Sequence, residues 1–288
     1  MIDLTQLPAP AVIEELDFET IYANKLARFQ SLYPDYSAAL ESDPVVKLLE
    51  LAAYDEMMLR ARINDAAKAS MLAYATGADL DNRAADYGVT RLLVTPADPD
   101  ATPPIEAVWE GDDRLRYRCQ LALEGLSVAG SRGAYLFHTL TASANVLHAN
   151  IVSPQGGLVR AYILDRRSNG VPDQPLLDIV LAALSSETVI PLCDSVEVIA
   201  GQPLEFAVTA TIEFEGGLIA ATGGLPAAQA RLETMLDERR KLAGLVSLDD
   251  IYGALKTTGI RRIRLTSPTV DIECGEGQFP QCTAINLS

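Results

Sequence analysis

The sequence predicts a multidomain α+β protein in which a long N-terminal helical region precedes two small α/β modules. Apolar residues recur at helical spacing over residues 42–75. A proline-rich stretch then interrupts the pattern, and helical and strand-like patterns mix from there onward. We therefore divide the chain into an N-terminal arm and helical bundle region (1–93), a Pro-rich link (94–104), a middle α+β domain (105–200) and a C-terminal α+β domain (201–288).

Composition limits the classes of partner. The 288 residues suffice for more than one hydrophobic core. The formal net charge of -16 argues against nucleic acid, because binding a duplex requires clustered Lys and Arg that displace counterions. No apolar segment runs uninterrupted for the roughly 18 residues that a membrane span needs, and the N-terminus has no signal-peptide pattern. We expect neither nucleic acid nor a membrane as a partner.

The N-terminal region begins with an arm that Pro8 and Pro10 keep out of helix, followed by helical spacing over residues 18–33. The long helix over residues 42–75 has a capping residue at Ser42 or Asp43. At about 1.5 Å per residue it would be roughly 50 Å long, which exceeds what a private core needs. We expect it to pack in a bundle with other chains.

The expected contact seam of this helix follows steps of four and three residues from Val45 to Ala73, and seven of its nine positions are apolar. These seven are the predicted partner-binding residues: Val45, Leu49, Ala52, Leu59, Ile63, Ala66 and Ala73.

The stretch "DLDNRAADYG", residues 79–88, groups carboxylates that a metal ion or acid–base catalysis could use. It lacks the glycine that a calcium loop of the D-x-[DN]-x-[DN]-G type requires. We interpret Gly77 as the end of the long helix, Asp79 as the cap of a short one, and Gly88 as its close. The carboxylates are then helix-start and surface charges.

The remaining elements follow from hydrophobic periodicity and turn residues. In the middle domain we expect helices at 109–126, 131–143 and 171–187, a hairpin of strands at 145–154 and 157–164, and a strand at 194–201. In the C-terminal domain we expect strands at 204–216 and 260–268, helices at 225–242 and 247–259, and a hairpin over 269–288.

The chain lacks a convergent catalytic set. His138 and His148 have no metal-ligand spacing, and "GLSVAG" at 125–130 has one residue too many for a nucleophile elbow. No phosphate-binding glycine loop is present. Cys274 and Cys282 could face each other across the expected hairpin, but their spacing does not establish a disulfide. We predict an interaction protein with no catalytic, metal or cofactor site.

Residues 2–19, "IDLTQLPAPAVIEELDFE", and residues 41–91, from "ESDPVVKLLELAAYDEM" to "DYGVTR", resemble the baseplate assembly protein J family of contractile-tailed phages. R-type pyocins carry relatives. The resemblance continues through "EGLSVAGSRGAY" at 124–135 and covers essentially the whole chain.

The resemblance implies a structural wedge subunit, with two copies of this chain and one I-like wedge protein in a heterotrimer. Six wedges would surround a central hub or spike, with a gp25-like, lysozyme-related subunit linking them to the sheath. N-terminal helices would form the bundle, and C-terminal modules would join neighbouring wedges into a ring. On infection this ring would rearrange and trigger sheath contraction. The protein would be assembled in the host bacterial cytoplasm and reside in the tail baseplate of a virion or particle. The alternative is a tail-associated cell-wall hydrolase, which would need a carboxylate pair in a cleft.

Overall fold

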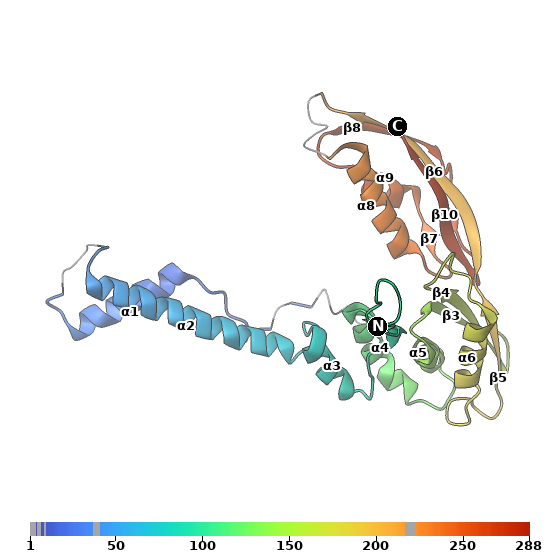
Figure 1. Cartoon of the computed structure of the whole chain (residues 1–288), viewed down its shortest axis with the longest axis horizontal. Helices are drawn as coiled ribbons and strands as arrows, with labels where there is room; N and C mark the ends of the chain where they lie inside the picture. The colour runs from blue at the N-terminus through green and yellow to red at the C-terminus, as the bar shows by residue number, and fades with distance from the viewer. Residues whose placement is uncertain (1–3, 5–6, 9, 37–40, 217–222) are drawn as a thin grey trace. The chain divides into compact units, whose positions relative to one another are not determined.

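The computed structural model describes residue 4 and residues 7–8, 10–36, 41–216 and 223–288. Two compact units form: unit 1 comprises Met1–Arg91 and Gly111–Gln120, and unit 2 comprises Leu92–Glu110 and Leu121–Ser288. Helices make up the N-terminal region, whereas the sheets lie in unit 2 (Figure 1). The predicted α+β fold class is confirmed. Among the described residues, no helix combines the length and apolar character that a membrane crossing requires.

Unit 1 is built on two helices, α1 (Phe18–Leu32) and α2 (Pro44–Ala69), which pack against each other. The Asp17 carboxylate accepts a hydrogen bond from the Thr20 amide at 2.8 Å and so caps α1. Asp43 caps α2 by accepting from the Val45 amide at 2.7 Å, and Pro44 occupies the first helical turn, where its missing N–H costs nothing. The sequence therefore specifies both helix starts locally.

The long helix is shorter than expected. The sequence predicts it over residues 42–75, but the helix ends at Ala69, and turns follow it up to residue 75. The Arg116 guanidinium explains this end, because it donates to the carbonyl oxygens of Leu72 at 2.8 Å and Ala75 at 2.7 Å. With 26 residues, α2 is about 39 Å long rather than 50 Å.

A short helix, α3 (Gly77–Ala85), follows the turns. Gly77 starts it rather than ending the previous helix, and Asp79 lies in its first turn instead of capping it. The cap comes from a distant residue, since the Gly77 amide donates to the Asp112 carboxylate at 3.0 Å. The predicted close at Gly88 is confirmed: its φ is +67°, and the Val89 amide donates to the Ala84 carbonyl, as in a Schellman motif.

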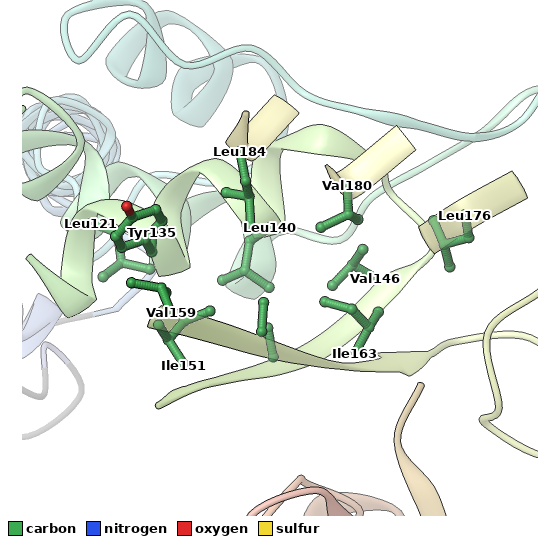
Figure 2. Close-up of a cluster of buried hydrophobic side chains, with 12 residues drawn as sticks. Leu121, Tyr135, Leu140, Val146, Ile151, Val159, Ile163, Leu176, Val180 and Leu184 are labelled. Carbon is green, nitrogen blue, oxygen red and sulfur yellow. The ribbon is translucent and has the colours of Figure 1, made fainter. Parts of the chain in front are cut away.

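The first sheet of unit 2 contains β3 (Val146–Gln155), β4 (Leu158–Asp165) and β5 (Ser195–Ala200) in that spatial order. The predicted β3–β4 hairpin is confirmed, and β5 runs parallel to β4. The predicted helices are present as α4 (Asp112–Gly125), α5 (Arg132–Ala142) and α6 (Gln174–Leu184). Side chains from α5 and α6 meet those of β3 and β4 in one buried cluster (Figure 2).

The Pro-rich segment is partly structured. Its first residues belong to β1 (Leu93–Thr95), which pairs antiparallel with β2 (Val108–Trp109). An antiparallel bridge joins Asp98 to Ile105 inside this ribbon. The ends of the segment are therefore held close together by backbone hydrogen bonds.

The second sheet has β6 (Gln202–Phe214) at its centre, between β10 (Gln278–Leu287) and β8 (Ile260–Ser267). Two helices, α8 (Gly224–Arg239) and α9 (Leu248–Leu255), pack on one face of this sheet (Figure 1). Their contact buries apolar residues at alternate positions of β6, including Val208, Ala210 and Ile212. This pattern is what the alternation in the sequence predicts.

The expected C-terminal hairpin over residues 269–288 is wrong. β9 (Ile272–Glu273) pairs with β7 (Leu245–Val246), whereas β10 runs parallel to β6. Burial favours this pairing, because on the edge of β6 the side chains of Cys282, Ile285 and Leu287 pack against the cluster under α8 and α9. Cys274 follows β9 and Cys282 lies within β10 on another sheet, and both thiols are free.

One glycine joins the two sheets. Gly201 separates β5 from β6, and its amide donates to the Ile163 carbonyl at 2.8 Å, while the next amide, of Gln202, donates to Gly277 at 2.9 Å. A Cβ atom at position 201 would lie 2.8 Å from the Ile163 carbonyl oxygen. Nearby, the buried cluster of Leu164, Leu242 and Phe279 fills the junction. Close backbone approach at Gly201 thus allows one chain segment to serve both sheets.

We expect Gly201→Ala to lower the free energy of unfolding by about 1–3 kcal/mol, because the added methyl group meets a fixed backbone carbonyl. Urea unfolding of the full chain measures the change. Gly156→Ala is the matched control, since no atom lies within 4 Å of its Cβ position. Equal unfolding free energies for the two variants would contradict the close approach.

Candidate interaction surfaces

An apolar stripe along α2 has no cover within the described part of unit 1. The opposite face of the helix, with Val46, Ala53 and Asn64, is buried. The large side chains of the stripe remain well exposed: 67% for Leu59, 64% for Leu48 and 60% for Ile63. We define the α2 stripe by its exposed apolar residues: Leu48, Leu51, Ala52, Met58, Leu59, Ile63 and Ala66.

The predicted partner-binding residues fall into three groups. Ala52, Leu59, Ile63 and Ala66 belong to the α2 stripe. Val45 and Leu49 also lie on α2 but are half-buried, and Ala73 is outside the helix in the turns that follow it. The exposed stripe therefore lies to one side of the predicted seam. It includes Leu48, Leu51 and Met58, which are not in the seam. The displacement could not be read from spacing alone, because it depends on which face α1 covers.

An open groove of about 520 Å³ runs beside the stripe between α1, α2 and the N-terminal arm. Apolar side chains of both helices line it, among them Ile21, Phe29 and Leu49. An ion pair between Lys25 on α1 and Glu56 on α2 crosses it at 2.6 Å, and Glu56 also pairs with Arg60 along α2 at 2.7 Å. The groove and the stripe together form a surface onto which an amphipathic helix could pack.

The N-terminal arm is held to α2 by the side-chain amide of Asn64. This amide accepts a hydrogen bond from the Glu14 backbone N–H at 3.0 Å and donates to the Glu14 carbonyl at 2.8 Å. The Glu14 carboxylate also pairs with Arg60 at 3.0 Å. Asn64 is only 8% exposed, and these two hydrogen bonds satisfy the polar atoms of its buried side chain. Asn64 is not among the predicted site residues, although a polar residue at a buried position of α2 is a signal for such a contact.

The carboxylates of residues 79–88 serve the bend after α2. Asp81 pairs with Arg91 at 2.7 Å, and a second nitrogen of Arg91 pairs with Asp112 at 2.7 Å. Asp86 pairs with Arg83 at 2.6 Å, and Asp79 stands in the first turn of α3. The hydrogen bond from the Gly77 amide, followed by the charge of Arg91, lowers the pKa of Asp112. Arg91 thus links Asp81 to Asp112, whereas Asp86 forms a separate local pair with Arg83.

Other chemistry-bearing residues make structural contacts. His138 lies on α5, with its Nε2 3.2 Å from the Gly125 carbonyl, and burial lowers its pKa. Ser127 follows α4 and accepts a hydrogen bond from the Ala129 amide. In the part of the chain that the structure describes, no three His, Cys, Asp or Glu residues gather as a metal site would require.

The junction between the two sheets of unit 2 contains His148. Its Nδ1 accepts a hydrogen bond from the Leu242 amide at 3.3 Å. Burial, assisted by the charge of Lys241, lowers the pKa of His148 to about 4. Across the same junction, Asn150 donates to the Glu276 carbonyl at 2.8 Å. Two side chains of β3 therefore hydrogen-bond to two separate segments beside the second sheet, one at Leu242 and one at Glu276.

Comparison with known proteins gives consistent matches. Residues 41–98 match the model of the baseplate J-like N-terminal domain, and residues 127–200 match that of the baseplate J-like central domain. Baseplate protein J of Escherichia phage P2 is 42% identical to this chain over 290 residues. The alignment covers 98% of this chain and 96% of the phage protein.

We expect Asn64→Leu to release the arm while α2 stays folded. Two hydrogen bonds to the Glu14 backbone are lost, which should increase the local opening of residues 10–16 about tenfold. Cleavage by a glutamate-specific protease at Glu14 and Glu15 measures this opening. The control is Asp65→Asn, a change at the neighbouring exposed position. An unchanged cleavage rate in Asn64→Leu would show that the amide does not hold the arm.

We expect His148 to make the stability of unit 2 depend on pH. Its folded pKa lies below its unfolded value, so the unfolded state takes up a proton first as the pH falls. Between pH 7.5 and pH 5 the free energy of unfolding should drop by about 2 kcal/mol from this group alone. Urea unfolding at both pH values should show a correspondingly smaller drop for His148→Gln. Parallel losses in both proteins would contradict the buried neutral imidazole.

Proposed function

The chain belongs to the baseplate J-like family and is a structural subunit of a baseplate, and we propose that it acts there as a wedge subunit. The observation that carries this proposal is the α2 stripe. A helix face that exposes Leu48, Leu59 and Ile63 together is an apolar patch of the kind that marks a protein–protein interaction site.

We propose that α1 and α2 form the part of the wedge where chains join in a helical bundle. Two copies of this chain and one I-like wedge protein would contribute the helices. The groove between α1 and α2 supports this assignment, because its lining alternates apolar side chains with ion pairs at the rim. A partner that docks on such a surface would bury apolar area, and the charges would favour a partner of complementary charge.

We propose that unit 2 makes the lateral contacts. Within it we keep the division at residues 105–200 and 201–288 as a proposal, with the Pro-rich link at 94–104. The middle and C-terminal modules would join neighbouring wedges into a ring around a central hub or spike, and a gp25-like subunit would connect the ring to the sheath. Rearrangement of this ring would trigger sheath contraction, in a virion or pyocin particle assembled in the host cytoplasm. The hydrogen bonds across Gly201 support modules that move together.

We expect the double variant Leu59→Glu/Ile63→Glu of the full chain to lose at least about tenfold in capture of the co-expressed I-like subunit, because two carboxylates would be buried in an apolar contact. The measurement is pull-down of the tagged full chain, quantified against input. Circular dichroism checks that the helices remain folded.

The matched control for this experiment is Leu192→Glu/Val270→Glu. Both residues are exposed apolar side chains of unit 2, so the charge change is the same while the α2 stripe is untouched. Capture at the wild-type level by Leu59→Glu/Ile63→Glu would contradict a bundle built on α2.

A further inference from the structure

The single tryptophan of the chain, Trp109, lies on the two-stranded ribbon that β1 and β2 form, and 53% of its surface is exposed. Its direct cross-strand partner is Leu93, so the two side chains share one face of the ribbon. Val108 occupies the other face, because successive residues of a strand alternate. Leu93, Val108 and the nearby Ile105 are all exposed as well. Within the described residues, both faces of the ribbon therefore carry uncovered apolar side chains.

Backbone contacts hold this ribbon, residues 92–109, from its base to near its tip. At the base, the amide of the buried Glu110 donates to the Leu92 carbonyl at 2.9 Å, and its carboxylate accepts from the Leu92 amide at 3.1 Å. Farther out, Asp98 and Ile105 exchange two backbone hydrogen bonds of 2.9 Å. A two-stranded ribbon is only marginally stable by itself, so a surface that buries its apolar side chains would stabilise it.

The charges of the ribbon indicate the chemistry of that surface. Asp98, Asp100 and Glu106 are exposed and have no ion pair in the described part of the chain, and residues 92–109 include no Lys or Arg. These charges repel an anionic lipid surface. They also disfavour a second copy of this chain, whose net charge is -16. A complementary surface carries Lys or Arg around an apolar centre.

We propose that the ribbon is a docking element that inserts Trp109 into an apolar pocket, rimmed by Lys or Arg, on another protein of the baseplate. Tryptophan is enriched among the residues that dominate binding energy, because its large ring fills a pocket and loses little entropy there. The ribbon belongs to unit 2, whereas the α2 stripe belongs to unit 1. This contact is therefore additional to the helical bundle of the proposed wedge.

Photo-cross-linking in the full chain identifies the partner. The cross-linking residue p-benzoylphenylalanine replaces Trp109, and the chain is co-expressed with the other baseplate proteins of its own particle. Purified baseplates should give a cross-link from position 109 to a different baseplate protein, at a site bordered by Lys or Arg. The control places the same residue at position 252, where Tyr252 is an exposed aromatic residue of α9.

Four results of this experiment would overturn the proposal: no cross-link from position 109 in assembled baseplates, a cross-link only to a second copy of this chain, a site without Lys or Arg, or the same product from position 252.

Substitutions then test the two parts of the contact separately, with the affinity of the full chain for the cross-linked protein as the readout. Trp109→Ala removes the apolar anchor, and Asp100→Lys/Glu106→Lys reverses the charge of the ribbon. Each should weaken binding at least about tenfold. All three side chains are exposed, so the fold should remain intact, which circular dichroism checks.

The matched controls are Tyr252→Ala, which removes another exposed aromatic ring, and Glu187→Lys/Glu276→Lys, which makes the same charge change elsewhere on unit 2. Both should bind like the wild type. Equal weakening by a ribbon variant and its control would overturn the proposal.

Fluorescence of the full chain tests a lipid surface as the alternative partner, because Trp109 is the only tryptophan. Vesicles of phosphatidylglycerol should leave its emission unchanged, and a blue shift would overturn a protein partner. The wedge proposal fails independently of this one. Capture of the I-like subunit reports on the α2 stripe, and the cross-link from position 109 reports on the ribbon.

Discussion

The exposed apolar face of α2 is the constraint on which the account of this protein depends. A helix of 26 residues has two faces to bury, and α1 covers only one of them. The hydrophobic cost of leaving the other in water scales with apolar area, and Leu48, Leu59 and Ile63 each expose more than half of their surface. Packing of a partner helix against this face, as we propose, would remove that cost.

Polar contacts determine how the exposed face is presented. Asn64 fixes the arm to the covered side of α2, which keeps the stripe clear. Arg116 ends the helix by taking the carbonyls of Leu72 and Ala75, and Asp112 starts α3 by accepting from Gly77. In unit 2, Gly201 lets the backbone that joins the two sheets approach Ile163 closely, because a side chain at this position would collide with the Ile163 carbonyl. Each of these residues acts on the backbone.

The sequence predicted the elements that depend on local signals. Capping residues such as Asp43 marked helix starts, and alternation in β6 marked a half-buried strand. The failures have a common physical origin in contacts between residues far apart in the chain. The end of α2 depends on Arg116, and the pairing of β10 with β6 depends on the cluster that Cys282 and its neighbours cover. The predicted seam runs through Leu49 and Ala52 instead of the neighbouring Leu48 and Leu51, because residue spacing does not show which face of α2 packs against α1.

Side-chain footprinting can show whether the α2 stripe is an interface between chains. Carbene labelling of the full chain, alone at low concentration and in complex with the I-like subunit, reports the exposure of individual apolar side chains. We expect labelling of Leu48, Leu59 and Ile63 to fall several-fold in the complex, while labelling of Leu192 in unit 2 is unchanged by contact with this partner. Unaltered labelling of the stripe in a stable complex would contradict an interface on α2.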